Sequence, residues 1–291
     1  MLHKIFKFTT SLGSRKFLNF LNDKTYLKLA YYGKMNKKLN LKNPKLFTEK
    51  LQWLKLNDRN PLYTELVDKY AVRTYIKEQL GKEYLIPLIA VYDKVNEIEW
   101  DKLPNQFVIK CTHGSGSNII CRDKNRLSIK ESNKKLKKWM RKNWYWFGRE
   151  WPYKNVKPRI IIEKYMVDIN SNQLRDYKLM CFNGSPKIIQ VMSNRLNGKY
   201  NLNHFSVDWE PLYYSRIGLF PSNEEIQKPK TLHQMLSFAK IISNGIPFVR
   251  IDFYEINGKL YFGEYTLYPV SGFMKFSDIE VDYILGEYLL L

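Results

Sequence analysis

Short apolar runs, some of them alternating with polar residues, recur from residue 84 to residue 266, and each predicts a β-strand. They fall at 84–93, 107–110, 118–121, 159–166, 173–182 and 187–193, and on both sides of the dipeptide Asn257-Gly258. Asn183-Gly184 and Asn257-Gly258 are typical of tight turns, so two of the strand pairs are expected to be antiparallel hairpins.

Apolar residues at helical spacing predict helices before, between and after these strands. The segment up to about residue 60 is helical and basic, with Thr48 as an expected helix cap, and further helices are expected at 66–80, 132–147, 231–243 and 279–291. The aromatic stripe of 132–147 favours packing, while its lysines are free to meet an anionic acceptor or lipid headgroups. Helices and antiparallel strands together predict an α+β fold.

The hairpin at 249–269 carries the strongest chemical signal. Alternation places Arg250 and Asp252 on one face of the first strand, and Glu264 and Thr266 share a face of the return strand. A turn of odd length at Gly258 is expected to bring Asp252 and Glu264 onto the same face. Two such carboxylates suit Mg²⁺, whereas the simpler interpretation is the solvent face of an ordinary hairpin.

A Gly/Ser loop between two strands is the second signal. Lys110 precedes Gly114, Ser115, Gly116 and Ser117, whose backbone N–H groups and hydroxyls suit phosphate. The order differs from a Walker loop, and a flexible hairpin is the alternative. His113 abuts the loop as a candidate phosphate contact or a solvated side chain.

Composition sets the class of protein. With 291 residues and 44% hydrophobic content, the chain suffices for one large or two moderate globular domains. Its three cysteines form no CxxC pair, so neither a disulfide framework nor a zinc cluster is expected, and a reducing cytoplasm fits. The basic start lacks a signal-peptide pattern, and no run is long enough for a membrane span.

A formal net charge of +20 indicates an anionic partner. Nucleic acid is one class, but no named recognition signature is present, so we expect none to bind. The others are the anionic inner face of a membrane, touched peripherally, and an anionic sugar such as a uronic acid, a nucleotide-sugar or a lipid-linked glycan.

The order of these parts resembles the ATP-grasp superfamily, and more closely its TupA-like branch, which is similar to the teichuronopeptide-biosynthesis protein. The resemblance rests on FTEKLQWLKLNDRNPLYTELVDKY, FVIKCTHGSGSN, REWPYKNVKPRIIIEKY, RDYKLMCFNG and YFGEYTLYP, and covers most of the chain from about residue 47. It implies two antiparallel α+β subdomains, at 66–165 and 166–291, that hold a nucleotide between them after a helical region at 1–65.

The resemblance also implies roles for individual residues. ATP and Mg²⁺ are the implied cofactors, and the residues divide into three groups. Lys69, Lys110, His113, Gly114, Ser115, Gly116, Ser117, Glu163, Tyr165 and Asp176 bind the nucleotide; Asp252, Glu264 and Thr266 bind the metal; and Arg250 and Lys178 act on the transferred phosphate. Thr266 departs from the pattern, because the superfamily usually has Asn there, which leaves the number of metal ions open.

The implied activity is a carboxylate–amine ligase that acts through an acyl phosphate in the synthesis of a surface polysaccharide such as capsule or O-antigen. Arg195 is a weaker candidate for the same anion-rich cleft as Asp176 and Lys178. Glu150, Trp151 and Tyr153 are candidates for an acceptor pocket, with core packing as the alternative for Trp151. The family is also often labelled glycosyltransferase, which is the alternative, but that activity favours an Asp-x-Asp metal motif and the sequence contains none.

Overall fold

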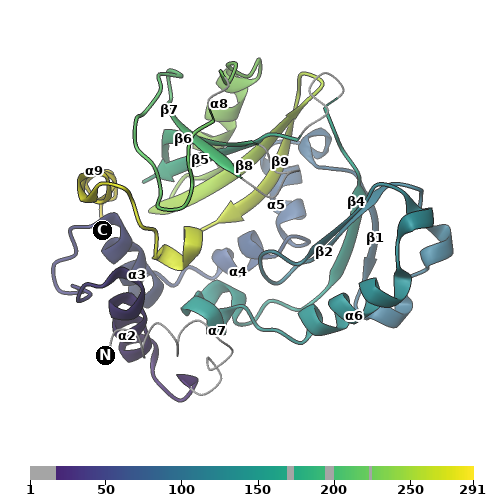
Figure 1. Ribbon diagram of the computed structural model, residues 1–291, viewed down its shortest axis with the longest axis horizontal. Coiled ribbons are helices and arrows are strands. Elements are labelled where there is room, and N and C mark those ends of the chain that lie inside the picture. The colour runs from purple at the N-terminus through teal and green to yellow at the C-terminus, as the bar shows by residue number, and fades with distance from the viewer. Residues whose placement is uncertain (1–17, 169–173, 194–199, 223–224) are drawn as a thin grey trace.

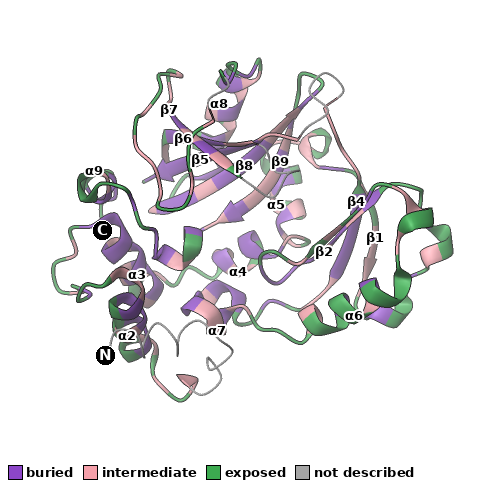
Figure 2. Ribbon diagram, in the orientation of Figure 1, coloured by how far each residue is buried: buried purple, intermediate pink, exposed green. Residues whose placement is uncertain are grey.

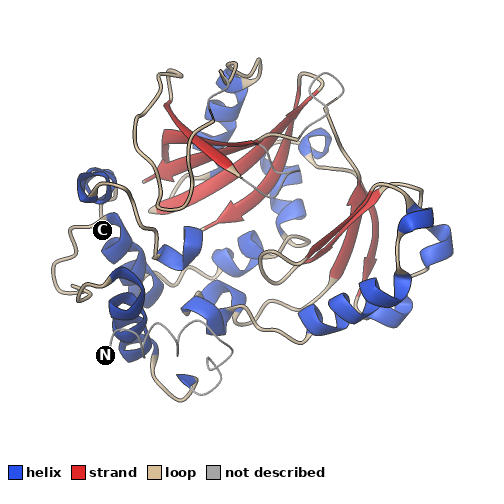
Figure 3. Ribbon diagram, viewed as in Figure 1, coloured by secondary structure: helices blue, strands red, loops and turns tan. Residues whose placement is uncertain are grey.

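The computed structural model describes residues 18–168, 174–193, 200–222 and 225–291. Within them lie two antiparallel sheets with helices around each, as Figure 1 and Figure 3 show. The α+β class predicted from the sequence, with two antiparallel sheets, is confirmed.

The smaller sheet has the strand order β1-β4-β2-β3. Its strands are β1 (Leu88–Tyr92), β2 (Phe107–Cys111), β3 (Asn118–Cys121) and β4 (Ile160–Lys164). β2 and β4 occupy its centre because their Ile and Phe side chains are buried on one face. That face packs against Leu136 of α6 (Ile129–Met140), which completes a separate hydrophobic core.

The larger sheet has the order β7-β6-β5-β8-β9. Its strands are β5 (Asp176–Phe182), β6 (Ser185–Ser193), β7 (Asn201–Ser206), β8 (Phe248–Ile256) and β9 (Lys259–Thr266). One face carries Leu179, Ile189 and Ile251, which are fully buried in the main core, together with Met235 of α8 (Leu232–Ile242). Figure 2 shows this burial along the strands of the sheet.

The amino-terminal helices α2 (Asp23–Met35) and α3 (Phe47–Asn57) pack together with the carboxy-terminal helix α9 (Ile279–Tyr288). The prediction that Thr48 caps α3 is wrong, because the helix begins at Phe47. Thr48 is buried instead, and both its backbone nitrogen and its hydroxyl donate to the carboxylate of Asp282. This pair joins the two ends of the described chain.

Two predicted helices are each broken in the structure. The helix expected at 66–80 is α4 (Leu62–Val67) followed by α5 (Val72–Gln79), because Asp68 accepts from the backbone of Tyr70 and caps the break. Lys69 lies in that break and donates its backbone N–H to Thr112 beside the Gly/Ser loop. The helix expected at 132–147 is likewise divided into α6 and α7 (Tyr145–Gly148).

One of the two domain limits proposed from the sequence lies inside a helix, and the other lies after a strand. The limit between residues 65 and 66 lies inside α4, and the limit between 165 and 166 follows the end of β4. No helix in the described part of the chain is long and apolar enough to cross a membrane.

Candidate active site

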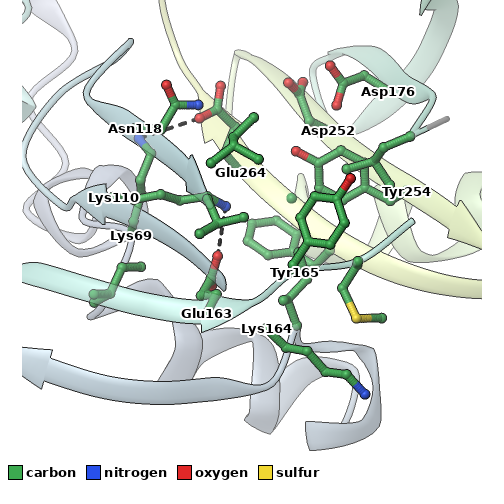
Figure 4. Close-up of a pocket in the computed structure, with 18 of the residues that line it drawn as sticks. Lys69, Lys110, Asn118, Glu163, Lys164, Tyr165, Asp176, Asp252, Tyr254 and Glu264 are labelled. Atoms are coloured by element: carbon green, nitrogen blue, oxygen red, sulfur yellow. Dashed lines mark ion pairs between the residues drawn. The ribbon is translucent and has the colours of Figure 1, made fainter. Parts of the chain in front are cut away.

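A cavity of about 700 Å³ lies between the two sheets. The smaller sheet and its loop contribute Lys110, Ser115, Gly116, Ser117, Glu163 and Tyr165, and the larger sheet contributes Asp176, Lys178, Asp252 and Glu264. Figure 4 shows Lys110 and Glu163 on one side and Asp252 and Glu264 on the other. Lys69, from the break between α4 and α5, lines the cavity as well.

Asp252 and Glu264 lie directly opposite one another on β8 and β9. The predicted pairing is correct, but the expected cause is wrong. Asn257 and Gly258 form a turn of even length with φ values of 52° and 72°. The shift in register comes instead from a β-bulge between Asp252 and Phe253, where Gly263 is the extra residue on β9.

Arg250 forms hydrogen bonds with both carboxylates of the acidic pair. Its Nε donates to Asp252 Oδ1 at 2.6 Å and its Nη2 to Asp252 Oδ2 at 2.7 Å, while the same Nη2 reaches Glu264 Oε1 at 3.2 Å and Thr266 Oγ1 at 3.0 Å. Lys178, opposite Asp252 on β5, contacts the second oxygen of that carboxylate. The carboxylates of Asp252 and Glu264 are thus neutralised by cations of the chain itself.

The same charges shift the ionisation of this group. Burial alone would raise the pKa of Glu264, but Lys69, Arg250, Lys178 and Lys110 lower it to about 2. Burial alone would lower the pKa of Arg250, but Asp252, Glu264 and Asp176 raise it above its usual value. Glu264, whose side chain is 30% exposed, is therefore an ionised carboxylate facing the cavity at neutral pH.

On the smaller sheet, Glu163 is fixed by two cations. Its Oε1 lies 3.0 Å from Arg73 Nη1, and its Oε2 lies 2.7 Å from Lys110 Nζ. Arg73, on α5, also donates to the backbone oxygen of Ile86 at 2.8 Å. Sequence reasoning missed Arg73, although its spacing of four residues from Lys69 fits one face of the helix predicted at 66–80.

Lys69 connects the Gly/Ser loop with the larger sheet. Its Nζ donates to the backbone oxygen of Gly114 at 2.7 Å and lies 3.4 Å from Glu264 Oε2. Gly116 has a φ of 71° and no atom within 4 Å of an added Cβ, so the tip of this loop borders open space. An ammonium group, open loop N–H groups and hydroxyls are therefore gathered at one end of the cavity.

Some predicted residues lie apart from the cavity lining. His113 is buried, and its Nε2 lies 3.2 Å from the backbone oxygen of Trp139 at a neighbouring cavity of about 420 Å³. Burial lowers its pKa. Arg250 and Thr266 lie next to Asp252 and Glu264 along the same two strands but do not line this cavity, and Gly114 contributes only its contact with Lys69.

The weaker acceptor-side candidates are not brought together in one pocket. Glu150 is buried and bonds Ser271, and the indole nitrogen of Trp151 donates to the backbone oxygen of Asp58 at 2.9 Å. Tyr153 is buried and lines the neighbouring cavity. Arg195, the weaker candidate for the anion-rich cleft, lies outside the described residues.

The oxygen donors at the acidic pair suit a hard divalent cation. Asp252, Glu264 and Thr266 offer carboxylate and hydroxyl oxygens on one face of the sheet. Among the described residues, no group of three or more His, Cys, Asp or Glu side chains is placed to hold a metal ion. This donor set fits Mg²⁺, which is commonly held by one or two carboxylates together with phosphate oxygens and water.

The three cysteines are buried and form no disulfide. Burial raises the pKa of Cys111 and that of Cys181 to about 12, so neither thiol is an activated nucleophile at neutral pH.

The chain is similar to solved structures of ATP-grasp ligases, but its sequence identity to them is low. D-alanine–D-alanine ligase from Bacillus anthracis complexed with ATP is 14% identical, with a TM-score of 0.41, and the match covers 70% of this chain and 54% of that one. The Helicobacter pylori D-alanine–D-alanine ligase is 14% identical, with a TM-score of 0.45 and coverage of 84% and 69%. The ATP-grasp ligase PsnB, complexed with its minimal precursor, Mg and ADP, is 9% identical, with a TM-score of 0.39 and coverage of 92% and 66%.

These likenesses are too remote to carry an argument, and the chain spans only about half of the Bacillus anthracis ligase. No curated protein matches the chain in sequence. The model of the TupA-like ATP-grasp family, in contrast, matches residues 49–290, which include both sheets and every residue of the candidate site. The chain therefore belongs to the TupA-like ATP-grasp family.

Proposed function

We propose that this protein is an ATP-dependent, ADP-forming ligase that joins a carboxylate to an amine, with Mg²⁺ as its metal. Family membership supports the proposal. The observation that carries it is a single cavity in which Lys69, Lys110 and the Gly/Ser loop face the acidic pair Asp252 and Glu264. Such a site binds a nucleotide polyphosphate and its cation together.

The nucleotide lies along the cavity. Lys69 and Lys110 bind its phosphates as point charges, and the backbone N–H groups of residues 114–117 cover them. The end of β4, at Glu163 and Tyr165, receives the adenine, and Asp176 binds the ribose. The ion pairs of Glu163 with Arg73 and Lys110 keep that strand end in place.

Asp252 and Glu264 hold the metal, with the Thr266 hydroxyl beside them. The ion supplies electrostatic stabilisation for the negative charge on the transferred phosphoryl group. Arg250 fixes the direction of both carboxylates through its hydrogen bonds. Lys178, 3.5 Å from Asp176 and in contact with Asp252, adds a positive charge where the phosphoryl group passes.

The reaction needs positioned reactants and no nucleophilic side chain. A carboxylate oxygen of the substrate attacks the γ-phosphorus of ATP, the bond to the β-γ bridging oxygen breaks, and ADP and an acyl phosphate result. The amine nitrogen then attacks the acyl carbon, inorganic phosphate leaves with the carboxylate oxygen, and the amine proton passes to solvent. The cations around the cavity stabilise the oxygens that gain charge.

The proposed carboxylate belongs to a sugar acid of a surface polysaccharide precursor, and the amine is an amino acid or amino compound. The formal charge of +20 supports an anionic acceptor, whether a nucleotide-sugar, a lipid-linked unit or a polymer. We place the protein in the cytoplasm, where the exposed lysines of α6 meet an anionic membrane surface peripherally.

Thermal unfolding with different ligands tests the nucleotide part of this function. Mg²⁺-ATP at one hundred times its Kd stabilises the fold by about 2.7 kcal/mol, and Mg²⁺-UDP-sugars do not. We expect Lys110→Ala to lose this stabilisation, because Lys110 lines the cavity. The matched control is Lys137→Ala on the exposed side of α6, away from the cavity, and we expect this variant to keep the stabilisation by Mg²⁺-ATP.

ADP release in the presence of sugar acids and amines then tests the ligase activity. Stabilisation by a UDP-sugar alone, with no response to Mg²⁺-ATP, would contradict the proposal and favour the glycosyltransferase. Stabilisation by ATP that survives Lys110→Ala would place the nucleotide elsewhere on the chain.

A further inference from the structure

A row of polar side chains crosses the larger sheet beyond the acidic pair. Residues opposite one another on antiparallel strands share a face. The pairings Asp252 with Glu264, Lys178 with Asp252, Gln190 with Lys178 and His204 with Gln190 therefore form one continuous row across the sheet. Gln190 Nε2 and His204 Nε2 lie 3.1 Å apart, which confirms that the outer half of the row is connected.

The segment 212–219 covers this outer half. The ring of Tyr214 lies on that of His204, with centroids 4.2 Å apart, and the backbone nitrogen of Leu212 donates to the backbone oxygen of His204 at 2.8 Å. Residues 215–217 pair with 275–277 through a bridge from Arg216 to Phe276 and two hydrogen bonds of 2.8 and 2.9 Å. Arg216 is thereby anchored through its backbone on the same side of the sheet as Asp252.

The guanidinium of Arg216 has no partner among the described residues. Within the described part of the chain its side chain takes part in no ion pair or hydrogen bond, although Arg216 is only partly exposed. Burial lowers its pKa, and the nearby positive charge of Arg250 lowers it further. Arg159, in contrast, has two acidic partners: its Nη1 lies 3.6 Å from Asp68 Oδ2 and its Nε lies 3.4 Å from Asp93 Oδ1. A partly buried, unpaired cation beside another cation is costly without a ligand.

Arg250 has donors to spare on its other edge. Its Nε and Nη2 make all of its hydrogen bonds to Asp252, Glu264 and Thr266, and its Nη1 makes none to any described residue. Arg216 is near enough to Arg250 for the two charges to repel, so two guanidinium groups with unused N–H donors lie near one another, and Arg250 is the one that contacts the acidic pair. Planar guanidinium groups with open N–H edges are well matched to carboxylates.

We propose that Arg216, together with the Nη1 edge of Arg250, binds the carboxylate of the acid substrate beside Asp252 and Glu264. This inference rests on the proposed ligase function and adds to it the place of the carboxylate substrate. The two positive charges repel one another in the protein alone, and a bound carboxylate relieves the repulsion by bridging them. Arg216 is a binding residue in this arrangement, and Gln190 and His204 support the wall behind it.

Titration of the full-length protein with sodium glucuronate, galacturonate or acetate in the presence of Mg²⁺-ADP tests this site. In the wild type, we expect at least one of these carboxylates to raise the Tm, with inorganic phosphate much less effective. Arg216→Gln weakens carboxylate binding by about tenfold, equivalent to about 1.4 kcal/mol. We expect Arg216→Gln to leave the stabilisation by Mg²⁺-ATP unchanged. We expect Arg216→Lys, which keeps the positive charge, to bind the carboxylate more tightly than Arg216→Gln does.

The stability of the ligand-free protein gives a second, independent readout. Because Arg216 has no partner among the described residues, we expect Arg216→Gln to keep or raise the Tm. The matched control Arg159→Gln breaks two ion pairs, so it lowers the Tm but keeps the response to carboxylates.

Four results would overturn the inference while leaving the ligase function intact. The first two are unchanged carboxylate affinity in Arg216→Gln and an equal loss of Mg²⁺-ATP stabilisation in that variant. The others are a wild-type protein that binds Mg²⁺-ATP but none of the three carboxylates, and a stronger response to inorganic phosphate than to every carboxylate. Absence of any response to Mg²⁺-ATP in the wild type counts instead against the ligase function.

Discussion

Asp252 illustrates how a buried charge is kept at this site. The residue is almost fully buried, and its carboxylate receives two hydrogen bonds from Arg250 and contacts Lys178. A buried ion pair contributes little net stability, but the removal of one partner leaves the other charge uncompensated. Glu264 is less demanding because its side chain is 30% exposed. Loss of the Asp252 charge is therefore expected to destabilise the fold more than loss of the Glu264 charge, although both residues are proposed metal ligands.

Asp252→Asn and Glu264→Gln separate these two contributions. We expect each to lower Mg²⁺-dependent ADP release by at least about 100-fold, because loss of a positioned charge at a reacting phosphate costs on the order of 3 kcal/mol or more. Asp252→Asn also destabilises the fold by about 3 kcal/mol, whereas Glu264→Gln costs less. Urea unfolding and an ADP-release assay measure both effects, with exposed Glu287→Gln as the control. Undiminished turnover in either variant would contradict the metal assignment.

Because His204 is buried, we expect the free energy of unfolding to depend on pH. Burial lowers its pKa to about 4 from the ordinary value of 6.5. As the pH falls from 6.5 toward 4, the unfolded chain binds a proton at this imidazole and the folded chain does not, so unfolding becomes more favourable. The loss is up to roughly 3 kcal/mol at pH 4.

Urea unfolding at pH 7 and pH 5 measures this dependence. His204→Gln reduces the loss between the two pH values, and the exposed His233→Gln leaves it as in the wild type. An identical loss in wild type and His204→Gln would show that this imidazole is protonated in the folded protein.

At the scale of elements, the β8–β9 hairpin depends on close backbone contact at Gly263. A Cβ added there would lie 2.9 Å from the backbone oxygen of Asp252 and 3.1 Å from Tyr254 Cε2. Gly258 in the turn has a φ of 72° and open space around it, so its requirement is conformational and local. The two glycines of one hairpin thus serve different purposes.

Gly263→Ala and Gly258→Ala form a matched pair. We expect Gly263→Ala to cost about 1–3 kcal/mol through overpacking and to weaken Mg²⁺-ATP binding, because it displaces the strand beside Asp252. Gly258→Ala costs about 1 kcal/mol through its positive φ and leaves nucleotide binding unchanged. Thermal unfolding with and without Mg²⁺-ATP distinguishes them, and equal nucleotide affinities in both variants would contradict a role of the bulge in the site.

The sequence predicts this hairpin only in part. The alternation of Arg250, Asp252, Glu264 and Thr266 indicates their shared face, but a bulge has no signal in a pattern of period two. The break at Lys69 was missed because Asp68 caps it through a hydrogen bond that helical spacing does not reveal. Arg73 and Arg216 were missed for a related reason. Whether a basic residue has an acidic partner depends on tertiary contacts, which one sequence does not contain.

At the scale of the whole molecule, the excess of positive charge extends beyond the cavity between the two sheets to a second cavity. The cavity beside α6 is lined by Arg141, Lys142, Lys154 and Lys157, and among these Lys157 is paired with Asp93 at 2.7 Å. The other three are exposed at the rim. Position, and not net charge alone, is therefore expected to decide where a polyanion binds.

Salt-dependent binding to immobilised heparin, used as a polyanionic probe, measures this effect. We expect the double substitution Arg141→Gln and Lys154→Gln to lower the salt concentration needed for elution more than Lys77→Gln with Lys82→Gln does. Both pairs remove two exposed positive charges, so net charge is matched. Equal elution of the two variants would show that the polyanion responds to total charge only.

The bulge at Gly263 has a consequence for chain length. Deletion of that glycine leaves Phe262 opposite Phe253 and Glu264 opposite Asp252, because the bulge already absorbs the extra residue. The pairing of the two acids is therefore insensitive to a one-residue deletion at this point, whereas a deletion elsewhere on either strand reverses which side chains face the cavity. Related chains of unequal length at this position can accordingly share one pair of acids, and differ only in the local twist that sets how far apart those acids are held.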